Sequence, residues 1–522
     1  MENVVERTAV DPYANKWLIA LGVTLASVME LIDTSIVNVA LTQMSANLGA
    51  TLDEIAWVST GYIIAAVIVL PMTGWLSSYF GRRRYFTASI IVFTIASFLC
   101  GQSSSLTELV IWRIVQGLGG GALIATSQAI LFESFPREEQ TMAAAVFGLG
   151  MMVGPAIGPT LGGLIVDRYT WPWIFYINIP FGILAALITA AFARDAQHQP
   201  RPTRIDVVGI ALITIGIGSL QFVLERGEHY EWFDSELIRL LAGCAAGGIV
   251  LLVAWELYVK EPILDLRVLK NRSLASGSAF AVVLGIALYG SIFAVPIYIQ
   301  QLLGWDAETS GWILFPGAIG SAVAMILIAR LGSKIPDLRW LALFGAFLLC
   351  ASMWMHSRFT TLSGRGDMLW PIALRGFATG CMFIPLATSA MAGLTGRALA
   401  QGTAIFNLTR QLGGSIGIAV LANLLTRQAA IHRAALVEHI VVGDPIAQAR
   451  LSMISHGLVA KGVNAFVANR QALAILSATV QRQATMLAFR DIFLIVGMLM
   501  LVSTPLILLL RKPGSGPVHI GE

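Results

Sequence analysis

The sequence predicts an all-α polytopic membrane protein with fourteen transmembrane helices. Of the 522 residues, 56% are hydrophobic and 12% are charged, and that charged fraction is about half the share found in an ordinary soluble domain. The mean hydropathy is +0.75. The apolar residues also form long runs, and a helix needs about 20 such residues to cross the hydrocarbon core. This composition excludes a soluble globular protein, a disordered chain and a disulfide-rich scaffold.

Polar stretches divide the chain into apolar runs of membrane-spanning length. SSYFGRRR, ESFPREEQ, RDAQHQPRPTRID and KNRS are four of these stretches. We expect spanning helices at roughly 17–41, 54–76, 85–102, 107–132, 142–166, 173–193, 206–224, 236–257, 274–302, 309–332, 338–356, 368–394, 401–425 and 487–510.

An internal repeat predicts two six-helix bundles and an inserted helix pair. Arg113 in the fourth run and Arg375 in the twelfth each precede closely spaced small residues. An offset of eight runs fits six helices, two inserted helices and six more, an arrangement that suits two parallel halves. The expected organisation is a cytoplasmic segment 1–16, an N-terminal bundle 17–193, a linker with the inserted pair 194–273, a C-terminal bundle 274–510 that contains a long helical periplasmic segment 426–486, and a cytoplasmic tail 511–522.

The distribution of Lys and Arg predicts that both termini are cytoplasmic. With the N-terminus inside, the short inner loops hold fourteen of these residues and the short outer loops hold four, which is the expected positive-inside bias. The polar N-terminus lacks a basic region followed by a cleavage site, so we expect the first run to be a retained helix and not a signal peptide. The formal net charge of +4 gives no reason to expect a nucleic-acid partner.

Two acids in the first run are candidates for proton coupling or cation binding. Glu30 and Asp33 are three residues apart and therefore share a helix face. Carboxylates at membrane depth are expensive and tend to face a cavity, while burial and a neighbouring carboxylate both favour the neutral acid. The alternative is a structural polar network, and the sequence does not separate the two acids. Arg113 is either a charge partner in the same proton path or half of a structural salt bridge.

Two further motifs concern helix packing and gating. The fifth run carries Gly150, Gly154, Pro155, Gly158, Gly162 and Gly163, and such closely spaced glycines let another helix approach closely. We expect a hinge or a close-contact helix there, with plain packing as the alternative. The loop after the second run carries Gly74, Gly81, Arg82, Arg83 and Arg84, which fits a tight cytoplasmic connection or simple anchoring by positive charge.

Aromatic and polar residues elsewhere could line a substrate cavity. Aromatic residues in spanning helices are more often packing or interface residues. The candidates are Trp57, Tyr62, Tyr289, Tyr298, Phe406 and Asn407.

No catalytic constellation is found, so we expect no enzyme, no metal site and no cofactor, with a proton gradient as the energy source. The sequence contains no Gly-Lys pair, so it has no G-K-[ST] phosphate loop. Gly413–Gly417 matches G-x-S-x-G, but it lies inside an apolar run and not at a strand-to-helix turn.

Several segments resemble the major facilitator superfamily. They are Leu31-Ile-Asp-Thr-Ser-Ile-Val-Asn-Val-Ala, Gly74 to Arg84, Arg113-x-x-Gln-Gly-x-Gly, and Gly150-x-x-x-Gly-Pro-x-x-Gly-Pro-x-x-Gly-Gly. Together with Trp171-Pro-Trp-Ile-Phe-Tyr-Ile-Asn-Ile-Pro, the fourteen runs make the chain similar to the EmrB/QacA branch of drug:proton antiporters, and to EmrB-type inner-membrane pumps in particular.

That resemblance implies the major facilitator fold, a bacterial inner-membrane location and several residue roles. Asp33 matches the family's first-span acid, Arg113 its fourth-span arginine, and Gly150–Gly163 its antiporter motif. The resemblance also implies a periplasmic adaptor and an outer-membrane channel as partners. The chain departs from the family at Ser78 and Tyr79, where the loop motif carries an acid and then a base, so the usual charge latch must be replaced by another contact or another acid.

These observations predict a proton-driven antiporter that exports hydrophobic or amphiphilic compounds through two rocking bundles. One alternative is a proton symporter or a dedicated metabolite exporter on the same fold. A second is a membrane sensor or scaffold that transports nothing.

Overall fold

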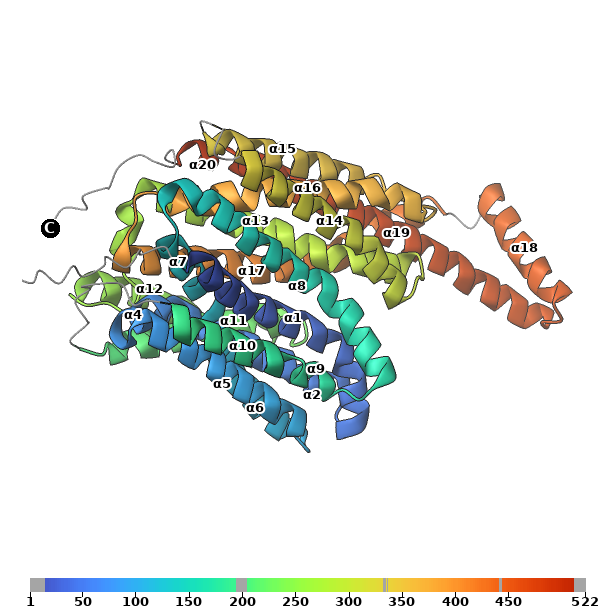
Figure 1. Cartoon of the computed structure of the whole chain (residues 1–522). Coiled ribbons are helices and arrows are strands. Elements are labelled where there is room, and N and C mark those ends of the chain that lie inside the picture. Colours follow the sequence, from blue (N-terminus) through green and yellow to red (C-terminus); the bar gives the residue numbers. More distant parts are fainter. Residues whose placement is uncertain (1–14, 194–203, 332–334, 336, 441–443, 511–522) are drawn as a thin grey trace, which may run out of the picture.

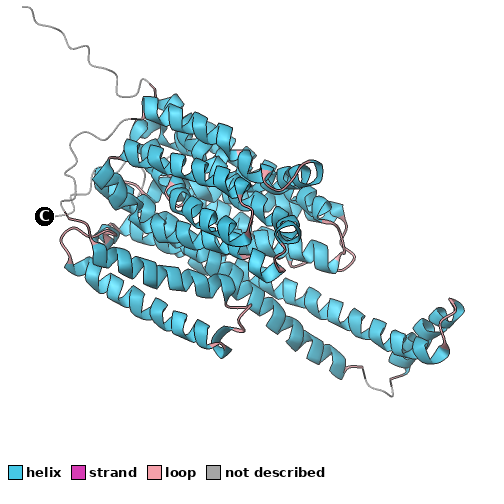
Figure 2. Ribbon diagram, turned by 90° about the horizontal axis from the view of Figure 1, so that it is seen from below, coloured by secondary structure: helices cyan, strands magenta, loops and turns pink. Residues whose placement is uncertain are grey.

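The computed structural model describes residues 15–193, 204–331, 335, 337–440 and 444–510. Segments 1–14 and 511–522, and with them most of the predicted cytoplasmic ends, lie outside the described residues. The described part is built from helices and contains no strand (Figures 1 and 2). Thirteen of its helical stretches are long and apolar enough to cross a membrane. α8, a helix of 29 residues, accounts for the fifth predicted run.

The first half of the protein comprises the helices up to α10. Their bounds are α1 Lys16–Leu48, α2 Leu52–Ile55, α3 Trp57–Val69, α4 Thr73–Phe80, α5 Arg82–Gln102, α6 Leu106–Gly120, α7 Leu123–Ser134, α8 Gln140–Arg168, α9 Trp173–Tyr176 and α10 Asn178–Phe192. The inserted pair is α11 Val207–Arg226 and α12 Glu236–Tyr258.

The second half comprises the helices from α13 onwards. Their bounds are α13 Arg272–Ile297, α14 Ala307–Leu331, α15 Leu338–His356, α16 Arg365–Ala390, α17 Gly396–Glu438, α18 Pro445–Ala460, α19 Ala465–Ser503 and α20 Pro505–Leu508.

The two halves repeat the same helix packing. α1 packs on α8 as α13 packs on α17, α3 packs on α6 as α14 packs on α16, and α5 packs on α6 as α15 packs on α16. The halves meet along a seam where α8 contacts α14 and where α17 contacts α4 and α7. The inserted pair packs on itself and lies beside this seam, with α11 against α3 and α17. This is the fold of two six-helix bundles with an inserted pair that the repeat predicts.

Local sequence explains where several helices begin and break. Asp206 caps α11 and Asn271 caps α13, each accepting hydrogen bonds from backbone N–H groups of the first turn. The predicted fourth span is divided into α6 and α7 at Gly121, where a Cβ would lie 2.3 Å from the Ala66 carbonyl oxygen of α3. Glycine is therefore required for this close approach.

The last two long helices extend beyond the spans that hydropathy predicts. α17 continues to Glu438 and α19 begins at Ala465, because a helix continues past the apolar boundary when a packed partner supports it. With α18 they form a projection at one end of the molecule (Figure 1). We call this the α18 end, and the opposite end the Arg82 end.

Candidate functional site

A buried ion pair joins the first and fourth spans of the first half. Arg113 Nη1 lies 2.6 Å from Asp33 Oδ2, and the two side chains are 1% and 0% exposed. The other Asp33 oxygen accepts hydrogen bonds from Gln116 Nε2 at 2.9 Å and Asn178 Nδ2 at 2.8 Å. Asp33 therefore has a full set of partners, drawn from α6 and α10.

The Arg113 guanidinium is satisfied as well. Its Nε donates to the Val58 carbonyl of α3 at 3.0 Å, Nη1 also donates to Gln116 at 2.7 Å, and the guanidinium carbon lies 4.3 Å from the centre of the Tyr62 ring. A buried charge pair needs good geometry and additional hydrogen bonds to offset its desolvation. The network meets that need and ties α1, α3, α6 and α10 together.

Glu30 lies one turn earlier on α1 and has a different environment. It is 8% exposed, and within the described residues its Oε2 has no hydrogen-bond partner. The carboxylate interacts with the Ile124 backbone N–H at the start of α7 and with the charge of Arg410 on α17. The hydroxyl of buried Tyr62 likewise has no partner in the described part of the chain. Glu30 thus faces the seam with capacity for another ligand or a proton.

The second half contributes polar residues to this point of the seam. Asn407 Nδ2 donates to Gln128 Oε1 of α7 at 2.8 Å, which is a direct hydrogen bond between the halves. Arg410 donates to Asn407 Oδ1 at 3.2 Å and to the Tyr289 hydroxyl of α13 at 3.4 Å. We call Glu30, Gln128, Tyr289, Asn407 and Arg410 the seam cluster.

Sequence reasoning missed two members of the seam cluster. Arg410 lies in the thirteenth apolar run. An arginine inside a spanning helix needs a partner, as Arg113 does, so its position in the run is the signal that identifies it. Gln128 gives no comparable signal, because a single glutamine in an apolar run is common. Tyr289 and Asn407, predicted as substrate contacts, do lie in the cluster.

The other predicted substrate contacts lie in packed surroundings. Trp57 packs on Phe222 of the inserted pair, with ring centres 5.7 Å apart. The Tyr298 hydroxyl donates to the Thr360 carbonyl at 2.6 Å, and Phe406 is buried in the core of the second half. Tyr62 lies against the Asp33–Arg113 pair. Their roles in substrate binding stay predictions.

The glycines of α8 bring it into close contact with α1. A Cβ on Gly150 would lie 2.5 Å from the Thr24 methyl, on Gly154 2.6 Å from Leu31 Cβ, on Gly158 1.8 Å from Ser35 Oγ, and on Gly162 2.8 Å from an Ile36 side-chain carbon. At Gly163 a Cβ would meet nothing within 4 Å. The side chain of Pro155 lies outside the described residues.

Gly154→Ala is expected to lower the free energy of unfolding by about 1–3 kcal/mol, because the new methyl group overpacks the contact with α1. Gly163→Ala is the matched control, because it adds the same methyl to the same helix in open space. Thermal unfolding of the two purified variants measures the difference. Equal stability of both would contradict the assigned contact.

The arginine-rich loop forms an ion pair with an acid at the end of α7. Arg82 is buried and forms an ion pair with Glu133 at the end of α7, and its Nη2 also donates to the Gly396 carbonyl of the second half at 3.4 Å. Gly81 has φ +88° and Gly74 lies against the backbone of Gln401 on α17, so both glycines are sterically required. Arg83 donates to the Ala190 carbonyl, and Arg84 is exposed.

Arg82→Gln is expected to weaken the packing of the two halves at the Arg82 end and to reduce transport several-fold. The substitution removes the ion pair with Glu133 and weakens the contact with the Gly396 carbonyl of the second half. The distribution of distances between spin labels on α4 and α17 should become broader. Arg84→Gln removes an exposed charge from the same loop and should leave those distances unchanged. Identical behaviour of the two variants would contradict the assignment of the contact to Arg82.

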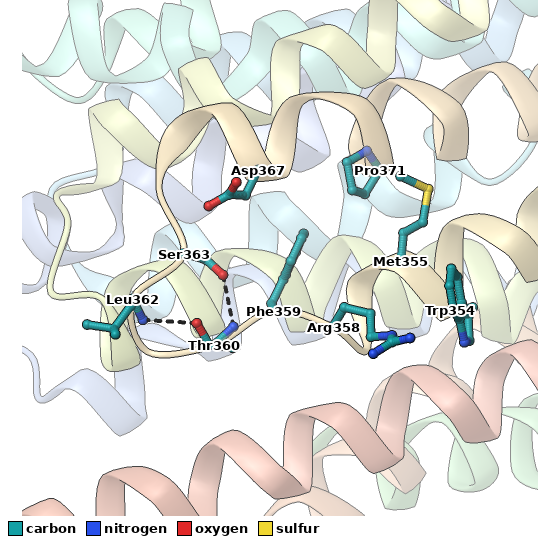
Figure 3. A pocket seen from close by; sticks show the side chains of 9 residues that line it. All are labelled: Trp354, Met355, Arg358, Phe359, Thr360, Leu362, Ser363, Asp367 and Pro371. Carbon is teal, nitrogen blue, oxygen red and sulfur yellow. Dashed lines mark hydrogen bonds between the residues drawn. The ribbon is translucent and has the colours of Figure 1, made fainter.

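A surface pocket lies away from the seam cluster. It measures about 490 Å³ and is formed where α15 ends and α16 begins, with Trp354, Arg358, Phe359 and Asp367 among its lining residues (Figure 3). Asp367 accepts a hydrogen bond from the Gly364 N–H and so caps its own helix. In the part of the chain that the structure describes, no group of three or more His, Cys, Asp or Glu side chains is placed to hold a metal ion.

Comparison with known proteins decides the family. The profile of the Major Facilitator Superfamily matches residues 23–418. The chain belongs to the Major Facilitator Superfamily. Multidrug export protein EmrB of Escherichia coli K12 is 34% identical over 509 residues, which cover 96% of this chain and 98% of EmrB. Fatty acid resistance protein FarB of Neisseria gonorrhoeae is 33% identical, with 95% and 96% covered.

Further similarities agree with this family. Colistin resistance protein EmrB of Acinetobacter baumannii is 28% identical, with 94% of this chain and 96% of that protein covered. Among solved structures, the superfamily's proton:xylose symporter XylE matches with a TM-score of 0.57 at 14% identity, over 95% of this chain and 97% of XylE. At that identity the match concerns the fold alone. The chain is thus an EmrB-like, multi-pass membrane protein of the superfamily.

Proposed function

We propose that the protein is a proton-driven antiporter that exports hydrophobic or amphiphilic compounds. The observation that carries this proposal is the buried Glu30 carboxylate, which faces the seam between the halves with one oxygen free of partners among the described residues. A buried acid at such a boundary can exchange a proton when access changes. The relatives named for multidrug export, fatty acid resistance and colistin resistance support export as the direction and amphiphilic compounds as the substrates.

The two acids have separate roles in this proposal. Asp33 is saturated by three donors and holds the helices of the first half together, while Glu30 accepts and releases the transported proton. Rocking of the halves about the seam cluster alternates access to the two sides. Substrate and proton favour different access states, and that difference is what couples their movements.

Orientation and partners complete the proposal. The arginine-rich Arg82 end faces the cytoplasm of a bacterial inner membrane, as the positive-inside rule requires, and the α18 end projects into the periplasm. Exposed apolar side chains on that projection, among them Ile446 at 80% and Phe466 at 67% exposure, suit a protein partner. A periplasmic adaptor joined to an outer-membrane channel is the partner proposed. The protein uses the proton gradient without a cofactor and catalyses no chemical reaction.

Imposed gradients in proteoliposomes test the direction of coupling. With the lumen made acidic, antiport predicts that added ethidium accumulates inside as protons leave. Uptake that requires the opposite gradient would establish symport. Absence of any gradient-dependent uptake, for ethidium and for a lipophilic anion and an uncharged dye tested alongside, would favour a sensor or scaffold.

A further inference from the structure

The second half presents a buried arginine to Glu30 across the seam. Arg410 of α17 is 4% exposed, and its charge acts on the Glu30 carboxylate of α1. Within the described residues, Arg410 Nε has no hydrogen-bond partner. Burying a guanidinium is expensive unless an opposite charge lies near, so Glu30 is the counter-charge that this position requires.

Arg410 and Glu30 lie on either side of the hydrogen bond between Asn407 and Gln128, which joins the two halves. Asn407, one turn before Arg410, accepts a hydrogen bond from it at 3.2 Å and donates to Gln128 of α7 at 2.8 Å. Gln128 lies one turn after Ile124, whose backbone N–H interacts with Glu30. Glu30 is on α1 of the first half and Arg410 is on α17 of the second half. A rotation of one half against the other therefore moves one charge relative to the other.

The other charged residues near Glu30 are either paired with each other or lie at helix ends. Asp33 lies on the same helix and is paired with Arg113 of α6, and Tyr62 of α3 contributes a phenol. α10 contains no ionisable residue, while those of α7 and α8 lie at the helix ends. Among the described residues, Arg410 is thus the cation facing Glu30 that no other carboxylate neutralises.

We propose that Arg410 is a positioning residue of the coupling site. Its positive charge opposes the binding of a proton by Glu30, most strongly in the arrangement of the halves that brings the two side chains together. An opposite charge favours the ionised carboxylate, whereas dry surroundings favour the neutral acid. A rotation that separates the two residues leaves Glu30 buried without its counter-charge, and the separated arrangement therefore binds the proton more tightly. By linkage, binding of the proton shifts the equilibrium of the two halves towards the separated arrangement. This inference rests on the proposed function, because it names the device that couples protonation to movement.

Infrared titration of the full-length protein in lipid nanodiscs tests the proposal without any substrate. The carboxylic-acid band that disappears in Glu30→Gln reports the protonated fraction of Glu30 as pH varies. Arg410→Gln should move the midpoint of this titration to higher pH by about 1 unit or more. Arg410→Lys keeps the positive charge, so its midpoint should stay close to that of the wild type. Asn407→Ala, which releases Arg410 from its anchor, should move the midpoint in the same direction by a smaller amount.

Arg375→Gln is the matched control. Arg375 is also a buried arginine of the second half, but it faces His356. A shift in Arg410→Gln with none in Arg375→Gln supports the proposal, even if no transport is ever detected. An unchanged midpoint in Arg410→Gln, or equal shifts in both variants, overturns it. If Arg410→Gln does not fold, the Asn407→Ala titration decides, and an unchanged midpoint in that variant overturns the proposal.

Discussion

Arg113→Met is expected to lower the free energy of unfolding by about 3–5 kcal/mol and to abolish transport. The substitution leaves Asp33 as an unpaired charge at 0% exposure, and it also removes the bond to the Val58 carbonyl that connects α6 to α3. Thermal unfolding of the purified protein, followed by tryptophan fluorescence, measures the loss.

The double variant Arg113→Met/Asp33→Leu separates the charge effect from packing. Removing both charges eliminates the uncompensated carboxylate, and apolar replacements of buried pairs are often neutral. The double variant should therefore recover most of the lost stability. A double variant that is as unstable as Arg113→Met would show that the pair does not account for the effect.

Glu30→Gln is expected to abolish substrate-dependent proton movement with the protein still folded, because the amide keeps the shape of the side chain but cannot bind and release a proton. Some loss of unfolding free energy is expected as well, since the buried Arg410 loses the opposite charge of Glu30. Substrate binding should persist and lose its dependence on pH. Fluorescence titration of the variant with a lipophilic dye at several pH values measures both properties. Binding that keeps the wild-type pH dependence would assign the titrating group to another residue.

Hydropathy predicted the fold class and the number of spans because burial in lipid imposes a length and a composition on each helix. The membrane spans predicted at 401–425 and 487–510 are shorter than α17 and α19, which continue into the segment 426–486 that the sequence predicts to be helical. A helix outside the bilayer is stabilised by its partner and need not be apolar. The break at Gly121 was missed, because the approach of α3 is a tertiary contact.

The candidate site was predicted in part. An acid or an arginine inside an apolar run is conspicuous, so Glu30, Asp33 and Arg113 were selected. Their separate environments could not be read from a spacing of three residues, because that spacing places both acids on one face, and the packing of α6, α7 and α10 around that face sets their partners. The pairing of Arg82 with Glu133 depends in the same way on helices far apart in the sequence.

Internal pH recorded in proteoliposomes shows which of the two acids carries the transported proton. Wild type, Glu30→Gln and Asp33→Asn would be compared under an imposed pH gradient while lipophilic cations, weak acids and uncharged dyes are added. We expect substrate-dependent proton movement in wild type, its complete loss in Glu30→Gln with the protein still folded, and a loss in Asp33→Asn that accompanies lowered stability. Proton movement that survives in Glu30→Gln, or that fails in a fully stable Asp33→Asn, would contradict the assignment of the transported proton to Glu30.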